Sequence, residues 1–419
     1  MKVFCGIDWA ERHHDVALVD ETGQLVAKKR ISDDAAGFAA LLELLGTAGD
    51  HPGGQIPVAI ETSRGLLVAA LRATGRPVYA INPMAVARYR ERRTVSRTKS
   101  DHADAMTLAD ILRTDSHVHR QLPADTQLGQ AVAVLARAHQ DASWRRSRAV
   151  NELRSLLREY YPSFLNTFTR KAGTCLSRAD ARALLAIAPT PTTGAKLSKA
   201  RIAAALRRAG RQRGINAHAE QLQAQLREPV LHQPELVEQA LGRQALALLA
   251  TLDAECASVD QLAQATIEAF EQHPDHAIIT SFPGLGEITG ARILGEMGDD
   301  RARFADARGV KAYAGSAPIT RASGRSLSIT HRRIKNNRFA AAGWMWAWAA
   351  IVHNEHARAH YQRRRDNGDR HSSALHHLFN RQLGQLWHCL QSGQPYNPEL
   401  AFTREASSTR AESVAARGS

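Results

Sequence analysis

Four acidic residues have the chemistry and the spacing to bind divalent metal ions: Asp8, Glu61, Asp101 and Asp104. Asp8 and Glu61 each end an apolar run that reads as a buried strand. Asp101 and Asp104 are three residues apart, so on a helix both side chains project from one face. A carboxylate at the end of a buried strand is costly unless a positive group pairs with it. Two strand-end acids and a helical acid pair therefore predict a metal site.

This set of acids suits phosphodiester chemistry. Two divalent ions ~3.5–4 Å apart can neutralise charge on the attacking and leaving oxygens, and carboxylates hold such ions. Mg²⁺ prefers oxygen ligands of this kind. The ordinary alternative for each acid is a surface residue or a helix cap. If Asp101 and Asp104 stood alone, that alternative would be preferred, because acids near a helix N-terminus interact favourably with the helix dipole. The four acids together indicate the metal site.

A second region, residues 314–338, combines serine, glycine and arginine. Between Arg321 and Arg338 there are six Lys or Arg residues and no acid. Serine and glycine among arginines predict a loop that binds phosphate. A serine here could also be a nucleophile, if cations stabilise the phosphorus that it attacks. From the residue types alone, the phosphate-binding loop is preferred.

Further residues are candidates for nucleic-acid contact. The Pro283-Gly284-Leu285-Gly286 step between two helical stretches is similar to the turn of a helix-hairpin-helix, whose backbone N–H groups face a phosphate. Three tryptophans, Trp344, Trp346 and Trp348, lie in an Ala-rich helical stretch and are expected mostly to pack in a core. The basic and glycine candidates are Arg88, Arg92, Arg93, Arg97, Lys99, Gly284, Gly286, Arg321, Arg325, Arg332, Arg333 and Lys335.

The composition favours a polyanionic partner. The chain has 419 residues, a formal net charge of +14 and a sequence pI of about 10.1, and its basic residues cluster. The four cysteines are far apart, which indicates neither a disulfide framework nor a zinc site. The sequence contains no signal peptide pattern and no apolar run near the ~20 residues that span a bilayer. We expect a cytoplasmic, nucleoid-associated protein that does not enter membranes.

The expected elements place the acids in an α/β domain over residues 1–120. Strands over 3–8, 14–20 and 24–31 predict an antiparallel meander. Helical and strand patterns then alternate, with helices over 35–45, 65–74 and 103–112 and strands over 58–61 and 78–81. This order is typical of the RuvC-like, ribonuclease-H-like fold.

The rest of the chain is expected to be mostly helical. Residues 121–275 predict a long helical or coiled-coil arm with an inserted subdomain. Such an arm could dimerise or could pair with itself within one chain, and the pattern fits both equally. Residues 276–400 predict a mostly α-helical C-terminal domain, and residues 401–419 a disordered tail.

At these residues the chain resembles the DEDD transposases of bacterial insertion sequences, which are serine-dependent recombinases guided by a bridge RNA. The resemblance covers residues 1–112 and about 276–400. It rests on Gly6-Ile7-Asp8, Glu61-Thr62, Ile81-Asn82-Pro83 and the segment from Lys99 to Ala105. In the second half it rests on Pro283-Gly284-Leu285-Gly286, Ala312-Tyr313-Ala314-Gly315 and Ser323-Gly324.

The resemblance implies a mechanism and partners. Asp8, Glu61, Asp101 and Asp104 would hold Mg²⁺, and Ser323 would form a transient 5′-phosphoserine link to DNA. The site would assemble between subunits of a homo-oligomer, a dimer or tetramer. A structured guide RNA would pair with donor and target DNA, so base pairing would select the sequence.

The sequence departs from the family pattern near the serine. Residues 325–328 are less rich in glycine than the family's loop, which leaves Ser326 and Ser316 as alternatives to Ser323. Two other functions compete with the recombinase: a hydrolytic, junction-resolving RuvC-like nuclease, and a non-catalytic nucleic-acid-binding scaffold. The target and donor sequences, the identity of the guide RNA, the number of metals and the activity of this copy are not encoded in any pattern of the chain.

Overall fold

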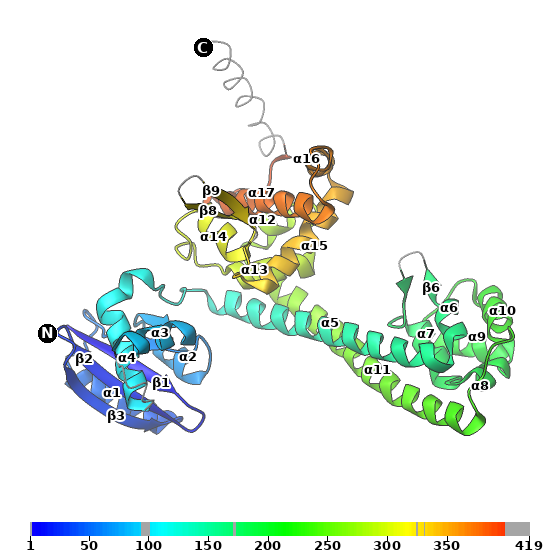
Figure 1. Cartoon of the computed structure of the whole chain (residues 1–419), viewed down its shortest axis with the longest axis horizontal. Coiled ribbons are helices and arrows are strands. Elements are labelled where there is room, and N and C mark those ends of the chain that lie inside the picture. The colour runs from blue at the N-terminus through cyan, green and yellow to red at the C-terminus, as the bar shows by residue number, and fades with distance from the viewer. Residues whose placement is uncertain (1, 94–100, 171–172, 324–325, 331, 399–419) are drawn as a thin grey trace, which may run out of the picture. The chain divides into compact units, whose positions relative to one another are not determined.

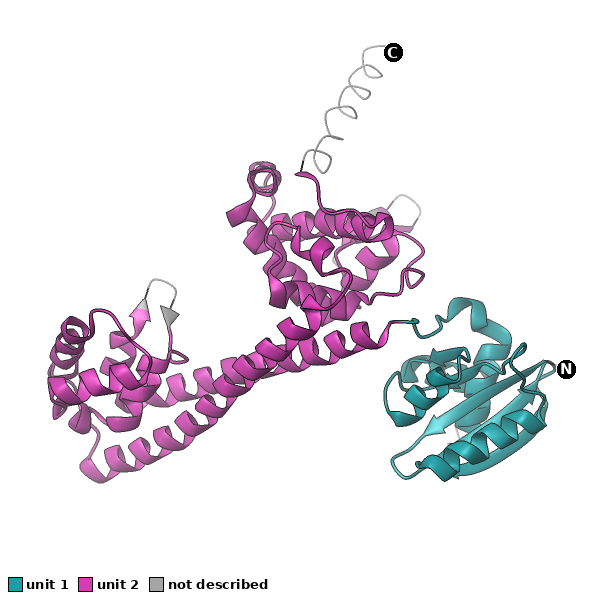
Figure 2. Cartoon of the chain, turned by 180° about the vertical axis from the view of Figure 1, so that it is seen from behind, with its two compact units in different colours: residues 1–124 teal, residues 125–419 magenta. Residues whose placement is uncertain are grey.

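The computed structural model describes residues 2–93, 101–170, 173–323, 326–330 and 332–398. The chain divides into two compact units, residues 1–124 and residues 125–419, which Figure 2 colours teal and magenta. The predicted boundary near residue 120 lies close to the division between the units, whereas the further divisions at 275 and 400 remain predictions.

The first unit is built on a mixed five-stranded sheet with the strand order β3-β2-β1-β4-β5 (Figure 1). β1, β2 and β3 form an antiparallel meander, and β4 and β5 run parallel to β1. The strands are β1 (Val3–Trp9), β2 (His13–Asp20), β3 (Leu25–Ser32), β4 (Val58–Ile60) and β5 (Val78–Ala80).

Helices cover both faces of this sheet. Alternate side chains of β1 point to opposite faces, so Cys5 and Ile7 pack with α1 (Ala35–Thr47) and α2 (Leu66–Ala73). Phe4 packs on the other face, against α3 (Pro83–Arg93) and α4 (Asp101–Asp115). A short 3₁₀ turn, Ser116–Val118, follows α4.

These elements confirm the predicted strands and the three predicted helices of the first unit, and they add α3, which the predicted order did not contain. The mixed sheet and the mostly helical remainder are compatible with a ribonuclease-H-like N-terminal domain. The patterns were readable because the buried strands are short apolar runs and the helices show a 3.6-residue period.

In the second unit, two long helices form an antiparallel arm. α5 (Gln127–Tyr160) and α11 (Glu235–Glu271) lie side by side in both views (Figures 1 and 2). Gln233 Nε2 donates to the Glu159 carbonyl oxygen at 3.2 Å, and Arg145 Nε lies 2.9 Å from Glu255 Oε1. The contact partner moves from residue 233 to residue 255 as the position on α5 moves back from residue 159 to residue 145, so the two helices run antiparallel. The arm therefore pairs within one chain, one of the two alternatives that the sequence left open.

A small helical subdomain is inserted at the end of the arm. It has its own hydrophobic core, in which Tyr161 and Phe164 are fully buried. Its elements are α6 (Pro162–Thr167), β6 (Thr169–Arg170), β7 (Gly173–Thr174), α7 (Ala179–Ile187), α8 (Pro191–Ala195), α9 (Lys199–Arg208) and α10 (Ile215–Leu226).

The C-terminal helices share a core with the beginning of the arm. Val132 and Ala136 of α5 are buried with Phe282, Phe339 and Trp346 in one cluster. The elements are α12 (His276–Thr280), α13 (Glu287–Met297), α14 (Ala307–Ala314), β8 (Ile319–Ser323), β9 (Ser326–Thr330), α15 (Asn337–His353), α16 (Glu355–Asp366) and α17 (His371–Ser392).

Two further findings concern the cysteines and the hydropathy of the helices. All four cysteines are free thiols, and Cys5 and Cys256 are buried. Among the described residues, no helix combines the length and apolar character that crossing a bilayer requires. The predicted disorder of residues 401–419 lies outside the described residues.

Candidate functional site

Asp8 and Glu61 come to the same end and face of the sheet. Ile7 of β1 is in register with Ile60 of β4, so the acids that follow them are neighbours on adjacent parallel strands. Asp8 lies on the face of Phe4 and Gly6 by strand alternation, and Glu61 follows Ala59, which packs on that face. Both acids are partly buried and have partners. The register thus brings together two of the four predicted acids.

α4 lies directly on β1 because residue 6 is glycine. A Cβ atom at Gly6 would stand 2.0 Å from the Ala105 carbonyl oxygen and 2.4 Å from the Ala109 nitrogen. No other residue type leaves room for the helix backbone at this distance. The contact sets the height of α4 above the strand that carries Asp8.

The direction of α4 follows from contacts at its two ends. Arg113, near its C-terminus, reaches the β2–β3 turn, where its guanidinium lies beside Gly23. At its N-terminus, His102 Nδ1 lies 3.2 Å from Asp15 Oδ1, and Asp15 is the β2 residue opposite Asp8. α4 therefore begins at the end of the sheet where Asp8 and Glu61 lie.

This direction brings Asp104 to the same end as the strand acids. Asp104 is 3% exposed and forms an ion pair with Arg90 of α3, with 2.6 Å between Arg90 Nη2 and Asp104 Oδ1. The side chain of Asp101 lies outside the described residues. Three of the four predicted acids are thus placed at one end of the sheet, on elements that converge there.

A fifth acid, Asp15, was not predicted. It is 2% exposed and pairs with Arg30, whose Nη2 lies 2.8 Å from Asp15 Oδ2. Its position directly across from Asp8 follows from the antiparallel register of β1 and β2. The signal in the sequence was an acid within a strand that is buried on both faces, which becomes informative only once the strand pairing is known.

The described side chains do not form a closed metal cluster. Among the residues that the structure describes, no group of three or more His, Cys, Asp or Glu side chains is close enough to hold an ion. Asp104 and Asp15 are neutralised by Arg90 and Arg30 instead. The donor chemistry suits Mg²⁺, since all the converging acids are carboxylates, but the set includes Asp101, whose side chain is not described.

Ser323 ends β8 on an exposed hairpin, where a loop was predicted. β8 and β9 pair antiparallel, with Ser323 opposite Ser326 and Arg321 opposite Ser328. Residues 319–323 and 326–330 are strands and not loop, and the sequence did not indicate them because β8 is short, mostly polar and almost wholly exposed. Ser323 is exposed, as is the rest of β8 after its first residue. Arg321 and Ser323 are two residues apart on a strand, so they share a face.

The two alternative serines differ in their surroundings. Ser326 is exposed and lies across the hairpin from Ser323. Ser316 is 1% exposed, its hydroxyl lies 3.3 Å from the Lys311 carbonyl oxygen, and Asn380 Nδ2 donates to it at 3.3 Å. A buried hydroxyl with two partners serves the packing of the segment after α14.

The glycines of the predicted phosphate turn have different environments. Gly284 has φ +82°, and a Cβ there would stand 2.6 Å from the Ala350 nitrogen of α15. Trp346 Nε1 donates to the Pro283 carbonyl oxygen at 3.1 Å, which ties the turn to the same helix. Gly286 is exposed and precedes α13 without a side-chain cap. Packing explains Gly284, and phosphate contact remains a prediction for both glycines.

The predicted basic residues fall into three groups. Arg88, Arg321 and Arg333 are exposed. Arg332 Nε donates to the Ala317 carbonyl oxygen at 3.4 Å, and Lys335 is partly buried beside Gly315. Outside the described residues lie Arg97, Lys99 and Arg325, together with the side chains of Arg92 and Arg93.

Comparison with known proteins identifies the family. A family model described as a transposase matches residues 5–162, and one described as the transposase IS116/IS110/IS902 family matches residues 276–362. A Streptomyces coelicolor protein assigned as the transposase of the IS117 mini-circle is 57% identical over 402 residues, 96% of this chain and 97% of the relative. The chain belongs to the IS116/IS110/IS902 family of transposases.

More distant relatives extend over nearly the full length of this transposase. The 42 kDa protein of insertion element IS900 from Mycobacterium paratuberculosis is 29% identical over 403 residues, 94% of this chain and 97% of the relative. The 43.6 kDa protein of insertion element IS110 from Streptomyces coelicolor is 27% identical over 422 residues, 95% of this chain and 96% of the relative. The transposase is a DNA-processing enzyme of an insertion sequence, as the resemblance predicted.

Proposed function

We propose that this transposase cuts and rejoins DNA through a covalent phosphoserine link at Ser323, with Asp8, Glu61, Asp101 and Asp104 holding Mg²⁺. The observation that supports the proposal best is the convergence of Asp8, Glu61 and the N-terminus of α4 at one end and one face of the sheet. Strand register places the two strand acids side by side, the Gly6 contact lays α4 on β1, and the contact between His102 and Asp15 supports the direction of α4.

The acids supply the ligands for the ions. Bound Mg²⁺ would neutralise negative charge on the scissile phosphate. The carboxylates at the ends of β1 and β4 fix the position of that charge, because both strands are held in the sheet on either side. Arg90 pairs with Asp104 at 2.6 Å, so it keeps this buried carboxylate compensated until a cation replaces the guanidinium.

Ser323 supplies the nucleophile. Its oxygen forms a bond to phosphorus while the bond from phosphorus to the 3′ oxygen breaks. The 5′ phosphate stays on the serine, and the 3′ oxygen leaves as a hydroxyl after taking up the proton that the serine releases. Attack by another 3′ hydroxyl reverses the step and joins a new strand without ATP. Arg321, on the same hairpin face, stabilises the phosphate charge.

A covalent trap tests this chemistry. The wild-type protein, Ser323→Ala and Ser326→Ala are each incubated with Mg²⁺ and element-end DNA that carries one nick and a label at the 3′ end of the cleaved strand, and the products are separated under denaturing conditions. We expect a protease-sensitive DNA adduct with the wild type and with Ser326→Ala, and none with Ser323→Ala. A Ser323→Ala protein that still cleaves without an adduct would establish the hydrolytic, junction-resolving alternative.

Asp8→Asn separates an enzyme from a scaffold. If the acids act in catalysis, this variant binds DNA as the wild type does but leaves it uncut. Unchanged transposition in cells by Asp8→Asn would instead support the non-catalytic scaffold.

We further propose that a structured guide RNA from the same element selects the DNA and that the active form is a homo-oligomer. The support is the family resemblance together with the net charge of +14 and the exposed Arg88, Arg321 and Arg333. Changing the bases of the RNA that pair with the target should redirect insertion, with the protein unchanged. Light scattering of the protein with and without this RNA measures the subunit number.

A further inference from the structure

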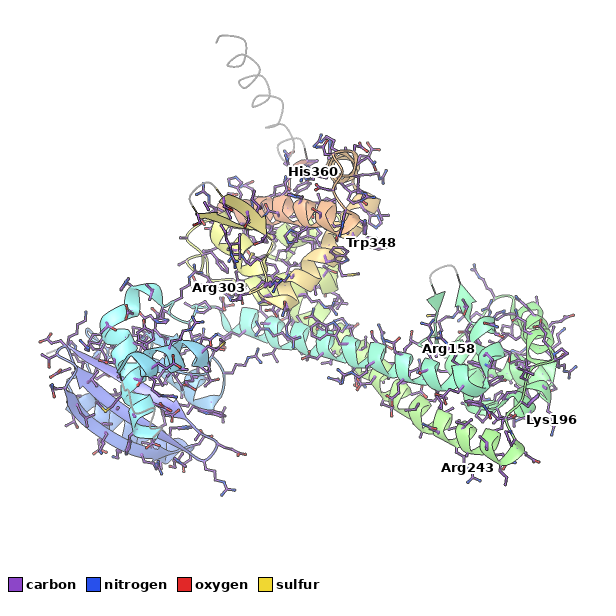
Figure 3. The ribbon with its side chains drawn as sticks, viewed as in Figure 1. Arg158, Lys196, Arg243, Arg303, Trp348 and His360 are labelled. Carbon is purple, nitrogen blue, oxygen red and sulfur yellow. The ribbon has the colours of Figure 1, made fainter. Side chains whose placement is uncertain are left out.

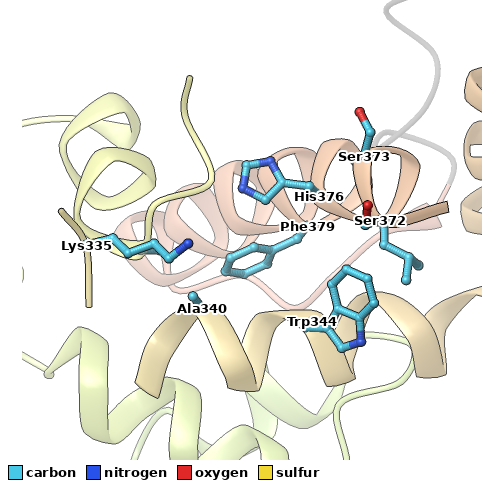
Figure 4. A pocket seen from close by; sticks show the side chains of 9 residues that line it. Lys335, Ala340, Trp344, Ser372, Ser373, His376 and Phe379 are labelled. Atoms are coloured by element: carbon cyan, nitrogen blue, oxygen red, sulfur yellow. The ribbon is translucent and has the colours of Figure 1, made fainter. Parts of the chain in front are cut away.

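A cavity of about 520 Å³ lies between α15 and α17 in the C-terminal helices (Figure 4). Its volume is within the range of small-molecule sites, roughly 300–1,000 Å³. Apolar side chains from several elements line it, among them Phe379 and Leu375. Its polar lining residues are Lys335, Ser372, Ser373 and His376.

One glycine constrains two of the cavity's polar groups, Lys335 and His376. Gly315 has φ +75° and lies so close to Lys335 that a Cβ would stand 2.2 Å from the lysine Cδ. His376 Nε2 donates to the Gly315 carbonyl oxygen at 2.9 Å. Residue 315 therefore positions both the lysine stem and the imidazole, and the side chains of Lys335 and His376 lie near Phe379 in Figure 4.

The aromatic wall is held in place as well. Trp344 is 39% exposed, and its ring meets His371 edge to face with 5.9 Å between centroids. His371 is hydrogen-bonded through Nδ1 to the Tyr361 hydroxyl at 2.7 Å. Below it, Phe379 packs where Gly343 leaves room, since a Cβ at Gly343 would stand 2.2 Å from that ring. An indole fixed at the mouth of a cavity offers a flat surface for stacking.

We propose that this cavity binds one unpaired nucleotide of the transposase's nucleic-acid partner, with the base against Trp344 and the phosphate toward Lys335. None of the residues that line the cavity is acidic, and the segment from residue 321 to 338 that leads into it has no acid. Stacking on an aromatic ring together with a cation for the phosphate is how proteins bind bases that have left a helix. This inference depends on the proposed function in one respect, namely that the partner is a nucleic acid.

Binding to two matched duplexes tests the proposal. One DNA duplex carries a single bulged 2-aminopurine, the other is fully paired, and both have the same length and salt. We expect the wild type to bind the bulged duplex about tenfold more tightly and to change the fluorescence of its 2-aminopurine. Trp344→Ala should lose this preference while keeping its affinity for the paired duplex. Trp344→Phe, which retains a ring, should keep most of the preference.

Trp348→Ala is the matched control. Trp348 lies on the same helix, is 50% exposed and does not line the cavity (Figure 3). We expect it to keep the preference for the bulge. Equal binding of both duplexes by the wild type, or equal loss of preference in the Trp344 and Trp348 variants, would overturn the proposal.

Free nucleotides distinguish the two sources of this ligand. AMP or UMP at millimolar concentration should compete weakly for the bulged duplex. Competition at micromolar concentration would identify a free nucleotide as the occupant and would overturn the assignment to nucleic acid. These are binding measurements on the full chain without cleavage, so a failure of the Ser323 chemistry would leave them unchanged.

Discussion

The two regions that carry the proposed chemistry differ in how firmly they are held. The acids of the first unit lie at the ends of sheet strands beneath a helix that touches the strand backbone. Ser323 lies on a two-stranded hairpin that is exposed, with the apolar Ile329 at 66% exposure on its second strand. The comparison indicates acids whose backbone positions are fixed by the sheet, and a nucleophile whose strand lacks a covering core.

The largest expected effect comes from removing a strand-end acid. Glu61→Gln should reduce DNA cleavage by about a thousandfold, because a ligand that places a metal ion is worth several kcal/mol of barrier. Thermal unfolding should change little, since Glu61 follows the last residue of β4 and is not part of its ladder. If Glu61→Gln cleaved DNA at a rate within tenfold of the wild type, Glu61 would not be a metal ligand, and the comparison between the two regions would fail.

The contact between α4 and β1 predicts a coupled loss of stability and activity. Gly6→Ala introduces a methyl group 2.0 Å from a carbonyl oxygen of α4, so the helix must move, at a cost of about 1–3 kcal/mol in the free energy of unfolding. Denaturant unfolding measures this cost, and cleavage should fall with the displaced acid pair.

Gly46→Ala is the control for this substitution. Gly46 lies in α1, where an added Cβ meets nothing within 4 Å, so alanine should stabilise the protein by about half a kcal/mol. Equal stability of the Gly6 and Gly46 variants would contradict the close contact.

Asp299, near the start of α5, is expected to affect the free energy of unfolding in a way that depends on pH. Burial favours a raised pKa for Asp299, but hydrogen bonds from Thr126 and His273 outweigh it and hold that pKa below its usual value. Asp299→Asn should lower the free energy of unfolding by about 1–3 kcal/mol at neutral pH.

This difference has a defined pH window. A carboxyl group whose pKa is lower in the folded protein than in the unfolded chain stabilises the fold. This stabilisation is fully present above the pKa of the unfolded chain, about 4, and is lost as the pH falls through the pKa of the folded protein. The gap between wild type and Asp299→Asn, followed by denaturant unfolding from pH 7 to pH 3, should therefore narrow only below about pH 4. Asp366→Asn, at an exposed site, should show no comparable gap.

The smallest expected effect concerns Arg321 of the hairpin. Arg321→Gln should weaken DNA binding by a few fold at all sequences and reduce the salt dependence of binding by about one charge. Stability should be unchanged, because the side chain is exposed. A sequence-dependent loss would show instead that Arg321 reads bases.

Much of the first unit could be predicted because its signals are local. Asp8 and Glu61 each follow an apolar run, and the helical spacing of Asp101 and Asp104 is visible without a partner. Asp15 could not be predicted, since its place beside Asp8 depends on strand register. The β8–β9 hairpin was missed because its strands are short and polar. The cavity beside Trp344 depends on Gly315, which is distant in sequence from α17, so no local pattern indicates it.

The shared core of α5 and the C-terminal helices has a consequence for synthesis on the ribosome. Val132 and Ala136 are made early, but Leu375 and Leu383, which complete the same cluster, emerge near the end of translation. The sheet of residues 1–124 can fold while the chain is still being made, whereas the beginning of α5 stays without its apolar neighbours until the last helices leave the tunnel. A truncated transcript therefore yields a folded sheet that carries an unfinished, aggregation-prone extension.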